Sequence, residues 1–418
     1  MIGQRIRYYR KTKNLTQEEL AKGICSVSYL SKIENGDAKS SEDVIELLCE
    51  RLGISPEEKQ LDVNLVGMLN EWNYLMVLRK YEEAETTHNK IKEYIPLIED
   101  PNTLIRYQLF LTRYFITTNN KTKASKQILE LNKYYETRSD VALNFYYHFI
   151  NGLFNHVESN YSQAIKHFEN AEAYIQHTPL NQVELATYYY SVALTQTHLF
   201  HNTAVINYAY KALDIFDKEY NFTRSADCQI LLGIVNRRIK NYLQSEYHFN
   251  QALKFAISFN NSKSLGIIYH NLGFVYSNKG DPEEAIKYYL KSLEIKNKVK
   301  DSNLQVTYFL IAKEYYNLEN YEESNKWMQK INIQLEKEPN DEYTIHYKIL
   351  KLRLNQQSGK EYENLLKKQA IPFFEDKNIM EYVCEYSTLL ADYYYKNSQY
   401  KNASENYKLA LKASQKFF

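Results

Sequence analysis

The stretch HNLGFVYSNKGDPEEAIKYYLKSLEI, residues 270–295, has the residue pattern of two antiparallel helices joined by a tight turn. The small residue Gly273 stands twelve positions before a second small residue, Ala285, and the aromatic Tyr289 follows one helical turn later. Two antiparallel helices approach closely only where both present small side chains, and a ring one turn later fills the space beside the crossing. Ser292, seven positions after Ala285, is small as well, so the pattern predicts a helical hairpin.

The same pattern recurs along most of the chain. The column of small residues after each turn runs, in steps of 39 to 41 residues with one gap near Asn364, through Ala84, Ala124, Ala164, Ala204, Ser245, Ala285, Ser324 and Ala403. A second column, twelve residues upstream, holds Gly152, Gly233, Gly273, Ala312 and Ala391. These offsets resemble those of the tetratricopeptide repeat, whose usual period is about 34 residues.

A single hairpin of this kind cannot bury its apolar face, so neighbouring hairpins stack. The spacing therefore predicts an all-α fold, with a right-handed α-solenoid of about nine tetratricopeptide-like hairpins between residues 65 and 418. We expect the first two repeats and the eighth to be degenerate, because the first and the eighth carry large residues at the upstream small position and the eighth lacks its alanine.

The composition agrees with a helical protein of a reducing compartment. Only 11 Gly and 7 Pro among 418 residues leave few helix breakers. The four cysteines lie far apart without metal-ligand spacing, so we expect them to be reduced and mostly buried, with no metal and no other cofactor. No stretch is apolar enough for a signal peptide or a membrane span, which predicts a cytoplasmic protein. No phosphate loop or nucleophile elbow occurs, so we expect no enzyme activity.

The first 60 residues predict a separate helical bundle. Thr16 and Glu19 form a capping box, Ser26 can cap the next helix, and Gly36 can end it. Residues 1–41 carry eight Lys or Arg against four Asp or Glu, although the whole chain has a formal net charge of only +1. Two short helices with a tight turn after a basic helix predict a helix-turn-helix whose second helix enters the major groove of DNA.

The segments LTQEELA (15–21) and SYLSKIENG (28–36) resemble the helix-turn-helix signature of phage repressors. The connection between them is one residue shorter than in that signature. In this it resembles the peptide-pheromone regulators of Gram-positive bacteria, the group of Rap, Rgg, NprR, PlcR and PrgX proteins. The resemblance implies that Gln17 contacts phosphate and that the second helix faces the groove. Together with the outward positions, it gives the candidate DNA-binding residues Gln17, Ser26, Val27, Ser28, Tyr29, Lys32 and Asn35.

The repeats predict a concave face lined by the first helix of each hairpin. A lining stripe lies 18, 15, 14, 11, 8 and 7 residues before the small residue of the second helix. Its amides suit a peptide backbone, its cations suit a carboxylate, and its aromatics form pockets for apolar side chains. Asn271 stands out, because a polar amide in an apolar run needs a partner that a ligand could supply. The candidate peptide-binding residues are Tyr189, Gln196, Asp227, Arg237, Arg238, His270, Asn271, Phe274, Lys313, Tyr316, Asn317 and Arg353; Asn278, Phe309 and Tyr395 share the stripe.

The expected organisation is a DNA-binding domain over residues 1–60 and a peptide-binding, oligomerising repeat domain over residues 61–418. In architecture the chain resembles the NprR-type members of the group most. The resemblance implies a quorum-sensing transcription regulator that binds double-stranded operator DNA, a short re-imported signalling peptide and further copies of itself. It also implies control of stationary-phase genes such as those of extracellular proteases. A second implied role is inhibition of a response regulator of the sporulation phosphorelay in the peptide-free state.

Two alternatives stay open from the sequence. In the first, the chain is a helix-turn-helix repressor whose repeats bind a protein partner rather than a peptide. In the second, it is a Rap-like regulator that acts chiefly by binding a phosphorelay protein. The sign of regulation, the operator and the peptide sequence do not follow from the residues.

Overall fold

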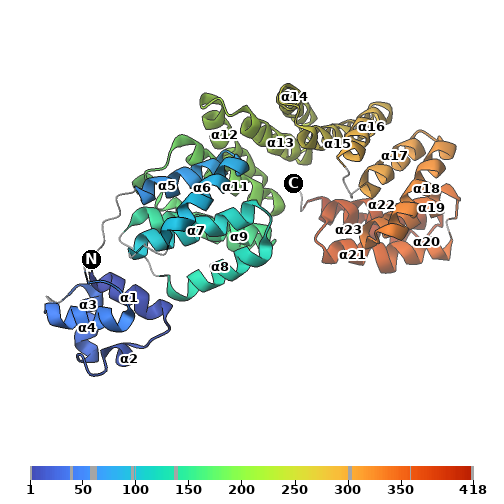
Figure 1. Ribbon diagram of the computed structural model, residues 1–418. Coiled ribbons are helices and arrows are strands. Elements are labelled where there is room, and N and C mark those ends of the chain that lie inside the picture. Colours follow the sequence, from blue (N-terminus) through green and yellow to red (C-terminus); the bar gives the residue numbers. More distant parts are fainter. Residues whose placement is uncertain are drawn as a thin grey trace. The chain divides into compact units, whose positions relative to one another are not determined.

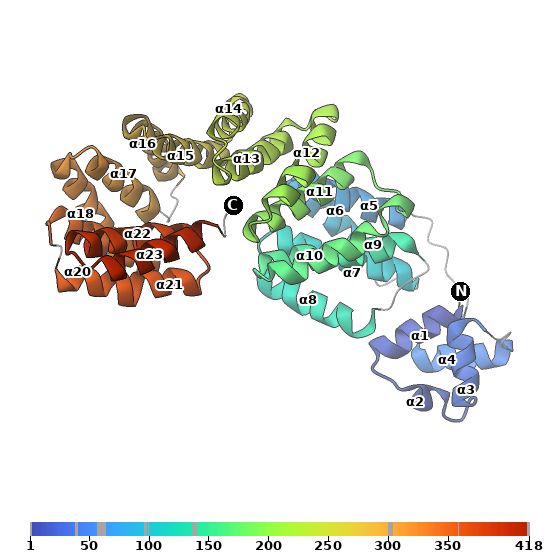
Figure 2. The ribbon, with the colours of Figure 1, turned by 180° about the vertical axis from the view of Figure 1, so that it is seen from behind.

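The computed structural model describes residues 2–37, 41–56, 64–95, 98, 100–135, 140–299, 304–357 and 359–415. These residues are helical or lie in turns and loops, and they contain no strand, which confirms the predicted all-α class. The chain divides into two compact units, Met1–Leu199 and Phe200–Phe418, which we call the N-terminal and C-terminal units. Within each unit, the two helices of a hairpin lie side by side, as α9 (Val141–Val157) and α10 (Tyr161–Glu172) do in one unit and α15 (Ser262–Lys279) and α16 (Pro282–Lys298) in the other (Figures 1 and 2).

The N-terminal unit begins with a bundle of short helices, the head. Its helices are α1 (Ile2–Thr12), α2 (Gln17–Ala21), α3 (Val27–Asn35) and α4 (Glu42–Leu52). They enclose an apolar core of their own, which includes the fully buried Ile6, Leu20, Leu30 and Leu48. The boundary expected at residue 60 falls among residues 57–63, outside the described part of the chain.

The rest of the N-terminal unit consists of helix pairs. Their bounds are α5 (Leu65–Val77), α6 (Tyr81–Tyr94), α7 (Pro101–Thr117), α8 (Lys121–Tyr134), α9 (Val141–Val157) and α10 (Tyr161–Glu172), followed by the 3₁₀ turn η2 (Ile175–His177) and α11 (Gln182–His198). In the first pair the small position twelve residues before Ala84 is filled by Trp72, which is fully buried and stacks on His88 with ring centroids 4.4 Å apart. A large ring therefore takes the place of the close helix crossing, as expected for a degenerate repeat.

The C-terminal unit continues the series. Its helices are α12 (Asn202–Lys218), α13 (Phe222–Arg238), α14 (Tyr242–Ser258), α15 (Ser262–Lys279), α16 (Pro282–Lys298), α17 (Gln305–Asn317), α18 (Tyr321–Lys337), α19 (Asp341–Leu354), α20 (Lys360–Asn364), the π-helical η3 (Leu365–Ala370), α21 (Ile371–Asp376), α22 (Met380–Lys396) and α23 (Tyr400–Ser414). Along the described residues, the helices follow the expected order of nine hairpins; eight of these each lie within one unit, while α11 ends the N-terminal unit and α12 begins the C-terminal unit.

The degenerate eighth repeat has a physical cause. Its second helix is broken into α20, η3 and α21, and Pro372 stands in the first turn of α21. Proline has no N–H to donate to the carbonyl four residues earlier, and its ring crowds that carbonyl. The helix widens into a π-helical turn just before the proline, at the repeat whose expected small residue is replaced by the exposed Asn364.

The small residues pack as the sequence predicts. A Cβ atom on Gly273 would lie 2.4 Å from the ring of Tyr289, and one on Gly233 would lie 2.7 Å from the ring of Phe249. Ser245 donates a 2.8 Å hydrogen bond to the carbonyl oxygen of Gly233, so in this repeat the small residue after the turn also ties the two helices together. The close crossing and the ring that fills it are thus present in these repeats.

In the fourth repeat the predicted register is wrong by one residue. The fully buried residue that follows the N-cap His201 by four positions is Val205, whereas Ala204 is half-buried. In the third repeat the same position after the N-cap Asn160 is Ala164. The sequence pattern favoured Ala204 because alanine is the smaller side chain. The structure places its neighbour Val205 at the buried position instead.

Of the four cysteines, Cys49 and Cys228 are buried as expected, while Cys25 and Cys384 are partly exposed, and none of the four forms a disulfide. No helix in the described residues is long and apolar enough to cross a membrane. The same residues contain no cluster of three or more His, Cys, Asp or Glu side chains that could hold a metal ion.

Candidate functional site

Helix α3 of the head has the geometry of a recognition helix. The Ser26 hydroxyl accepts a 3.2 Å hydrogen bond from the backbone N–H of Tyr29, and Gly36 ends the helix with φ of 82°. Leu30 and Ile33 are buried in the head. Because these two residues anchor one side of α3, its other side is left for solvent or for a ligand.

The candidate DNA-binding residues of α3 and its cap differ in exposure. Val27 is 42% exposed, and Ser26, Ser28, Lys32 and Asn35 are exposed as well, on the described surface of the head. Tyr29 is half-buried and packs against the core of the head. The exposed side of α3 therefore presents a short hydroxyl, a small apolar side chain and a cation, which are groups that read base edges and phosphates.

A buried ion pair holds α1 against α3. Arg10 donates to both carboxylate oxygens of Glu34, at 2.6 and 2.9 Å, and both side chains are almost fully buried. The side-chain amide of Gln17 donates to the same carboxylate at 2.8 Å, and Arg7 donates to Asn35 at 2.9 Å. Gln17 and Asn35, both candidates for DNA contact, are thus oriented by neighbours in the head.

In the N-terminal unit, buried polar side chains of α5, α7, α9 and α11 form hydrogen bonds with one another. Asn73 is fully buried, accepts a 2.7 Å hydrogen bond from Arg113 and donates a 2.6 Å hydrogen bond to Glu184. Tyr146 donates to the same carboxylate oxygen at 3.0 Å. This network was not among the candidate sites, and it fills with protein groups the space between α5, α7, α9 and α11.

Two of the peptide-binding candidates belong to the N-terminal unit. Gln196 is buried and Tyr189 is half-buried, and burial raises the pKa of the Tyr189 hydroxyl above its ordinary value. Both were counted from Ala204. Counting from Val205 instead moves the lining stripe to their neighbours Tyr190 and Thr197. Peptide binding by Tyr189 and Gln196 stays a prediction.

Asn271 has a partner that the sequence argument did not anticipate. Its amide nitrogen donates a 2.9 Å hydrogen bond to the carbonyl of Ile267, one turn earlier in the same helix. The amide nitrogen thus has a partner within its own helix, and peptide binding by the half-buried Asn271 stays a prediction. The neighbouring His270 packs edge-on against Phe274 with centroids 5.1 Å apart, and its Nδ1 is buried without a hydrogen bond.

The cations of α13 have different surroundings. Arg237 lies 4.9 Å from the centre of the Phe274 ring, and Arg238 lies 4.5 Å from that of Phe200. Burial, with Arg237 beside it, lowers the pKa of Arg238 to about 10, so Arg238 remains charged near pH 7. Asp227 on the same helix pairs with Arg224 at 3.3 Å.

Two carboxylates of α22 reach the candidate cations of other repeats. Glu385 accepts two hydrogen bonds from Lys313 of α17, at 2.7 and 2.9 Å, and Glu381 lies 3.9 Å from Arg237 of α13. Burial alone would raise the pKa of Glu385, but the Lys313 ammonium brings it below its ordinary value. The lining side chains of α13, α17 and α22 therefore face a common space.

The sequence analysis missed these carboxylates, although a signal for one existed. Glu385 lies 18 residues before Ala403, which is a position of the lining stripe in the last repeat. The candidate Asn317 is exposed and donates to Glu314 at 3.2 Å, so it too has a partner within its own helix.

The last two candidates line a cavity of about 400 Å³ in the C-terminal unit. The guanidinium of Arg353 lies 4.5 Å from the centre of the Tyr316 ring, stacked between α17 and α19. The cavity is lined by Tyr316, Leu352, Arg353, Gln356, Gln357, Tyr362, Leu389, Asp392, Tyr393, Lys396 and Asn397. An aromatic wall, amides and one stacked cation are the combination that the sequence predicted for a peptide site.

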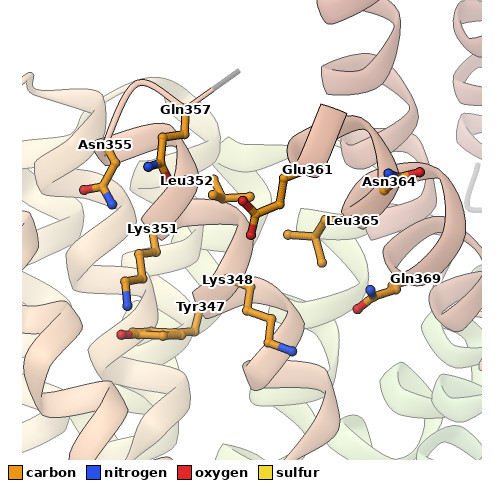
Figure 3. A pocket seen from close by; sticks show the side chains of 10 residues that line it. All are labelled: Tyr347, Lys348, Lys351, Leu352, Asn355, Gln357, Glu361, Asn364, Leu365 and Gln369. Atoms are coloured by element: carbon orange, nitrogen blue, oxygen red, sulfur yellow. The ribbon is translucent and has the colours of Figure 1, made fainter. Parts of the chain in front are cut away.

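A second cavity of the same unit, of about 730 Å³, contains none of the candidate residues. Figure 3 shows Tyr347, Lys348 and Lys351 of α19 on one side and Glu361, Asn364 and Gln369 on the other. Lys348 and Lys351 are exposed, so this cavity is a solvent-accessible groove on the surface, beside the broken helix of the eighth repeat.

Comparison with known proteins identifies both parts of the chain. A helix-turn-helix family model matches residues 6–59, and a tetratricopeptide-repeat model matches residues 264–331. The first match begins within α1 and includes α2, α3 and α4, and the second begins within α15 and ends within α18. These matches agree with the recognition helix and with the best-formed hairpin described above.

Full-length relatives extend the match. The chain is 34% identical over 401 residues to the transcriptional activator NprA of Geobacillus stearothermophilus, covering 94% of this chain and 98% of NprA. It is 24% identical over 376 residues to the response regulator aspartate phosphatase I of Bacillus subtilis (strain 168), covering 87% and 94%. The fold matches that of NprR in complex with its cognate peptide NprX, with a TM-score of 0.63, 22% identity and coverage of 85% and 99%. From its head, its repeats and its identity to NprA along nearly the whole chain, this protein belongs to the Rap/NprR family of regulators.

Proposed function

We propose that this chain is a peptide-responsive transcription regulator. Residues 1–60 bind operator DNA, and residues 61–418 bind a short linear peptide and join copies of the chain. The observation that carries the DNA part is α3, which is capped by Ser26, anchored by Leu30 and exposes Val27, Ser28 and Lys32. A helix fixed in this way can enter a major groove with its N-terminal residues at the base edges.

Support for the peptide part comes from the lining stripe of the C-terminal unit and from the relatives. The ion pairs of α22 join candidate lining residues of distant repeats, and a cavity with aromatic, amide and cationic walls lies between α17, α19, α20 and α22 of the same unit. NprR is described as bound to a cognate peptide, and NprA is named an activator. We therefore propose that peptide binding promotes activation, with extracellular protease genes among the targets.

A small head limits affinity for DNA, so the proposal includes a homodimer or a larger oligomer. Specific complexes bury about 1,000–2,500 Å² of protein surface, more than one short helix supplies. Two heads on one duplex would require half-sites spaced by one helical turn or a multiple of it.

Peptide capture tests the central claim. The purified chain is incubated with the peptide fraction (below about 3 kDa) of spent medium from cells that carry the gene, bound peptides are identified by mass spectrometry, and the synthetic peptide is titrated by calorimetry. We expect one short peptide that binds and changes the affinity of the chain for duplexes selected from a random-sequence pool. Capture of no peptide, or a peptide without effect on DNA affinity, would leave the repressor with a protein-binding repeat domain as the better reading.

The DNA part has a separate test. Lys32→Ala and Tyr29→Ala should each weaken binding to the selected duplex by about 1–3 kcal/mol at fixed salt, because each removes one contact. Lys254→Ala removes an exposed cation from α14 and is the matched control that should bind like the unsubstituted chain. Unchanged binding by both head variants would contradict the assignment of α3 as recognition helix.

A second candidate function rests on the relative named a response regulator aspartate phosphatase, which matches 87% of the chain. The peptide-free chain would then also bind a response regulator of the sporulation phosphorelay. Gel filtration of the chain with such a regulator, with and without the captured peptide, tests this role. Co-elution that the peptide abolishes supports it, and separate elution under both conditions contradicts it.

A further inference from the structure

The cavity beside Arg353 contains a cation whose surroundings differ from those of the other candidate cations. Arg237 has Glu381 at 3.9 Å and Lys313 has both oxygens of Glu385 within 2.9 Å. Among the described residues, no carboxylate oxygen lies within 4.0 Å of the Arg353 guanidinium. At this cavity the stripe thus offers an arginine whose charge no carboxylate of the described residues neutralises at close range.

The stacking of Arg353 on Tyr316 fixes its guanidinium in an orientation that suits a planar anion such as a carboxylate. The Tyr316 ring covers one face of the guanidinium, 4.5 Å from its centre, and a ring on that face does not use the in-plane N–H groups as hydrogen-bond donors. An arginine held in this way can donate two parallel hydrogen bonds to one carboxylate, and little side-chain freedom is lost on binding.

The rest of the cavity suits the end of a peptide. Its floor contains the buried Leu352 and Tyr362, which can cover one apolar side chain. Its rim holds the amides of Gln356, Gln357 and Asn397, which can pair with backbone groups. The carboxylate of the lining residue Asp392 accepts a hydrogen bond from Tyr407 at 2.5 Å, so it is engaged on the outer helix α23.

We infer that this cavity binds a carboxylate of the signalling peptide through Arg353, with the adjoining apolar side chain on Leu352 and Tyr362. The inference rests on the proposed peptide-responsive function and specifies where the negative end of the peptide lies. The carboxylate is either the C-terminus or an acidic side chain next to it, and the chemistry of recognition is the same for both.

The test is a thermodynamic cycle with the synthetic peptide whose sequence is captured as described above. Arg353→Gln should weaken binding of the free-acid peptide at least ten-fold, since a charge-assisted pair is lost. Amidation of the peptide C-terminus should weaken binding to the unsubstituted chain by a similar factor, but should have no further effect on Arg353→Gln. If a peptide with its acidic side chains changed to amides gives this coupling instead, the recognised carboxylate is the side chain.

Two further variants separate binding from folding. Lys348→Gln removes one cation from the same helix, outside this cavity, and should bind like the unsubstituted chain. Arg353→Lys keeps the charge but not the bidentate geometry and should bind with intermediate affinity. Equal losses for free-acid, amidated and side-chain-neutralised peptides on Arg353→Gln would overturn the carboxylate assignment while leaving the peptide function standing. If no peptide is captured at all, the proposed function fails, and this site fails with it.

Discussion

Replacing each of the two glycines of α15 by alanine should change stability in opposite directions. A Cβ atom on Gly273 would lie 2.4, 2.5 and 2.9 Å from three ring carbons of Tyr289, which is fully buried. A Cβ atom on Gly266 would come no closer than 3.4 Å to any such neighbour, the nearest being the Ile295 side chain. The two substitutions are chemically identical, lie two turns apart and differ only in what the new methyl group meets.

The expected magnitudes follow from two opposing effects. Alanine is favoured over glycine in a helix interior by about 0.8–1.0 kcal/mol, which applies to both positions. Forcing a methyl group into a filled core costs about 1–3 kcal/mol, which applies only at Gly273. Gly266→Ala should therefore raise the free energy of unfolding by up to about 1 kcal/mol, and Gly273→Ala should lower it by about 1 kcal/mol. The helix propensity cancels in the difference between the variants, which should be about 1–3 kcal/mol.

The assay must report locally, because stacked repeats need not unfold as one cooperative unit. Hydrogen exchange followed by mass spectrometry over residues 262–298 reads the opening free energy of the α15–α16 hairpin, with urea unfolding of the full chain as the global measure. Slower exchange in Gly266→Ala and faster exchange in Gly273→Ala are expected. Equal protection in the two variants would refute the claim that a glycine is needed for the close approach of Tyr289.

Three other substitutions test separate features. Burial, with Lys296 and Arg237 nearby, lowers the pKa of His270 to about 3, so below pH 6.5 the unfolded chain takes up a proton that the folded chain does not. Stability should fall by about 2 kcal/mol from this group between pH 6.5 and 5, and His270→Gln should flatten that part of the profile; an unchanged slope would contradict the assignment. Glu34→Gln leaves the buried Arg10 without its carboxylate and should destabilise the head by about 3–5 kcal/mol, seen as faster exchange over residues 2–52; protection like that of the unsubstituted chain would argue against the pair. Glu319, at φ of 57°, ends α17 in the left-handed region, so Glu319→Gly should raise stability by up to about 1 kcal/mol in urea unfolding, and a loss of stability would be evidence against strain there.

Local features of this protein followed from the sequence because they depend on residues three to sixteen positions apart. The capping box of Thr16 and Glu19, the cap of α3 by Ser26 and its end at Gly36 all occur as expected. The pairing of Gly273 with Tyr289 needs only that two consecutive helices pack antiparallel, which a short turn enforces. Repetition of the pattern then gave the solenoid and its degenerate eighth repeat.

Contacts between distant repeats were decided by the tertiary structure alone. The pairing of Glu385 with Lys313 joins residues 72 positions apart, and nothing in the local pattern of either helix specifies it. Each repeat turns slightly relative to the one before, and the sum of these small rotations sets which lining residues meet. For the same reason, Lys313 lies within reach of the Glu385 carboxylate, whereas Arg353 lines a cavity. A repeat pattern specifies each step of the helical array, but the accumulated curvature within a unit, and with it the set of side chains that line the candidate site, is a property of the whole unit.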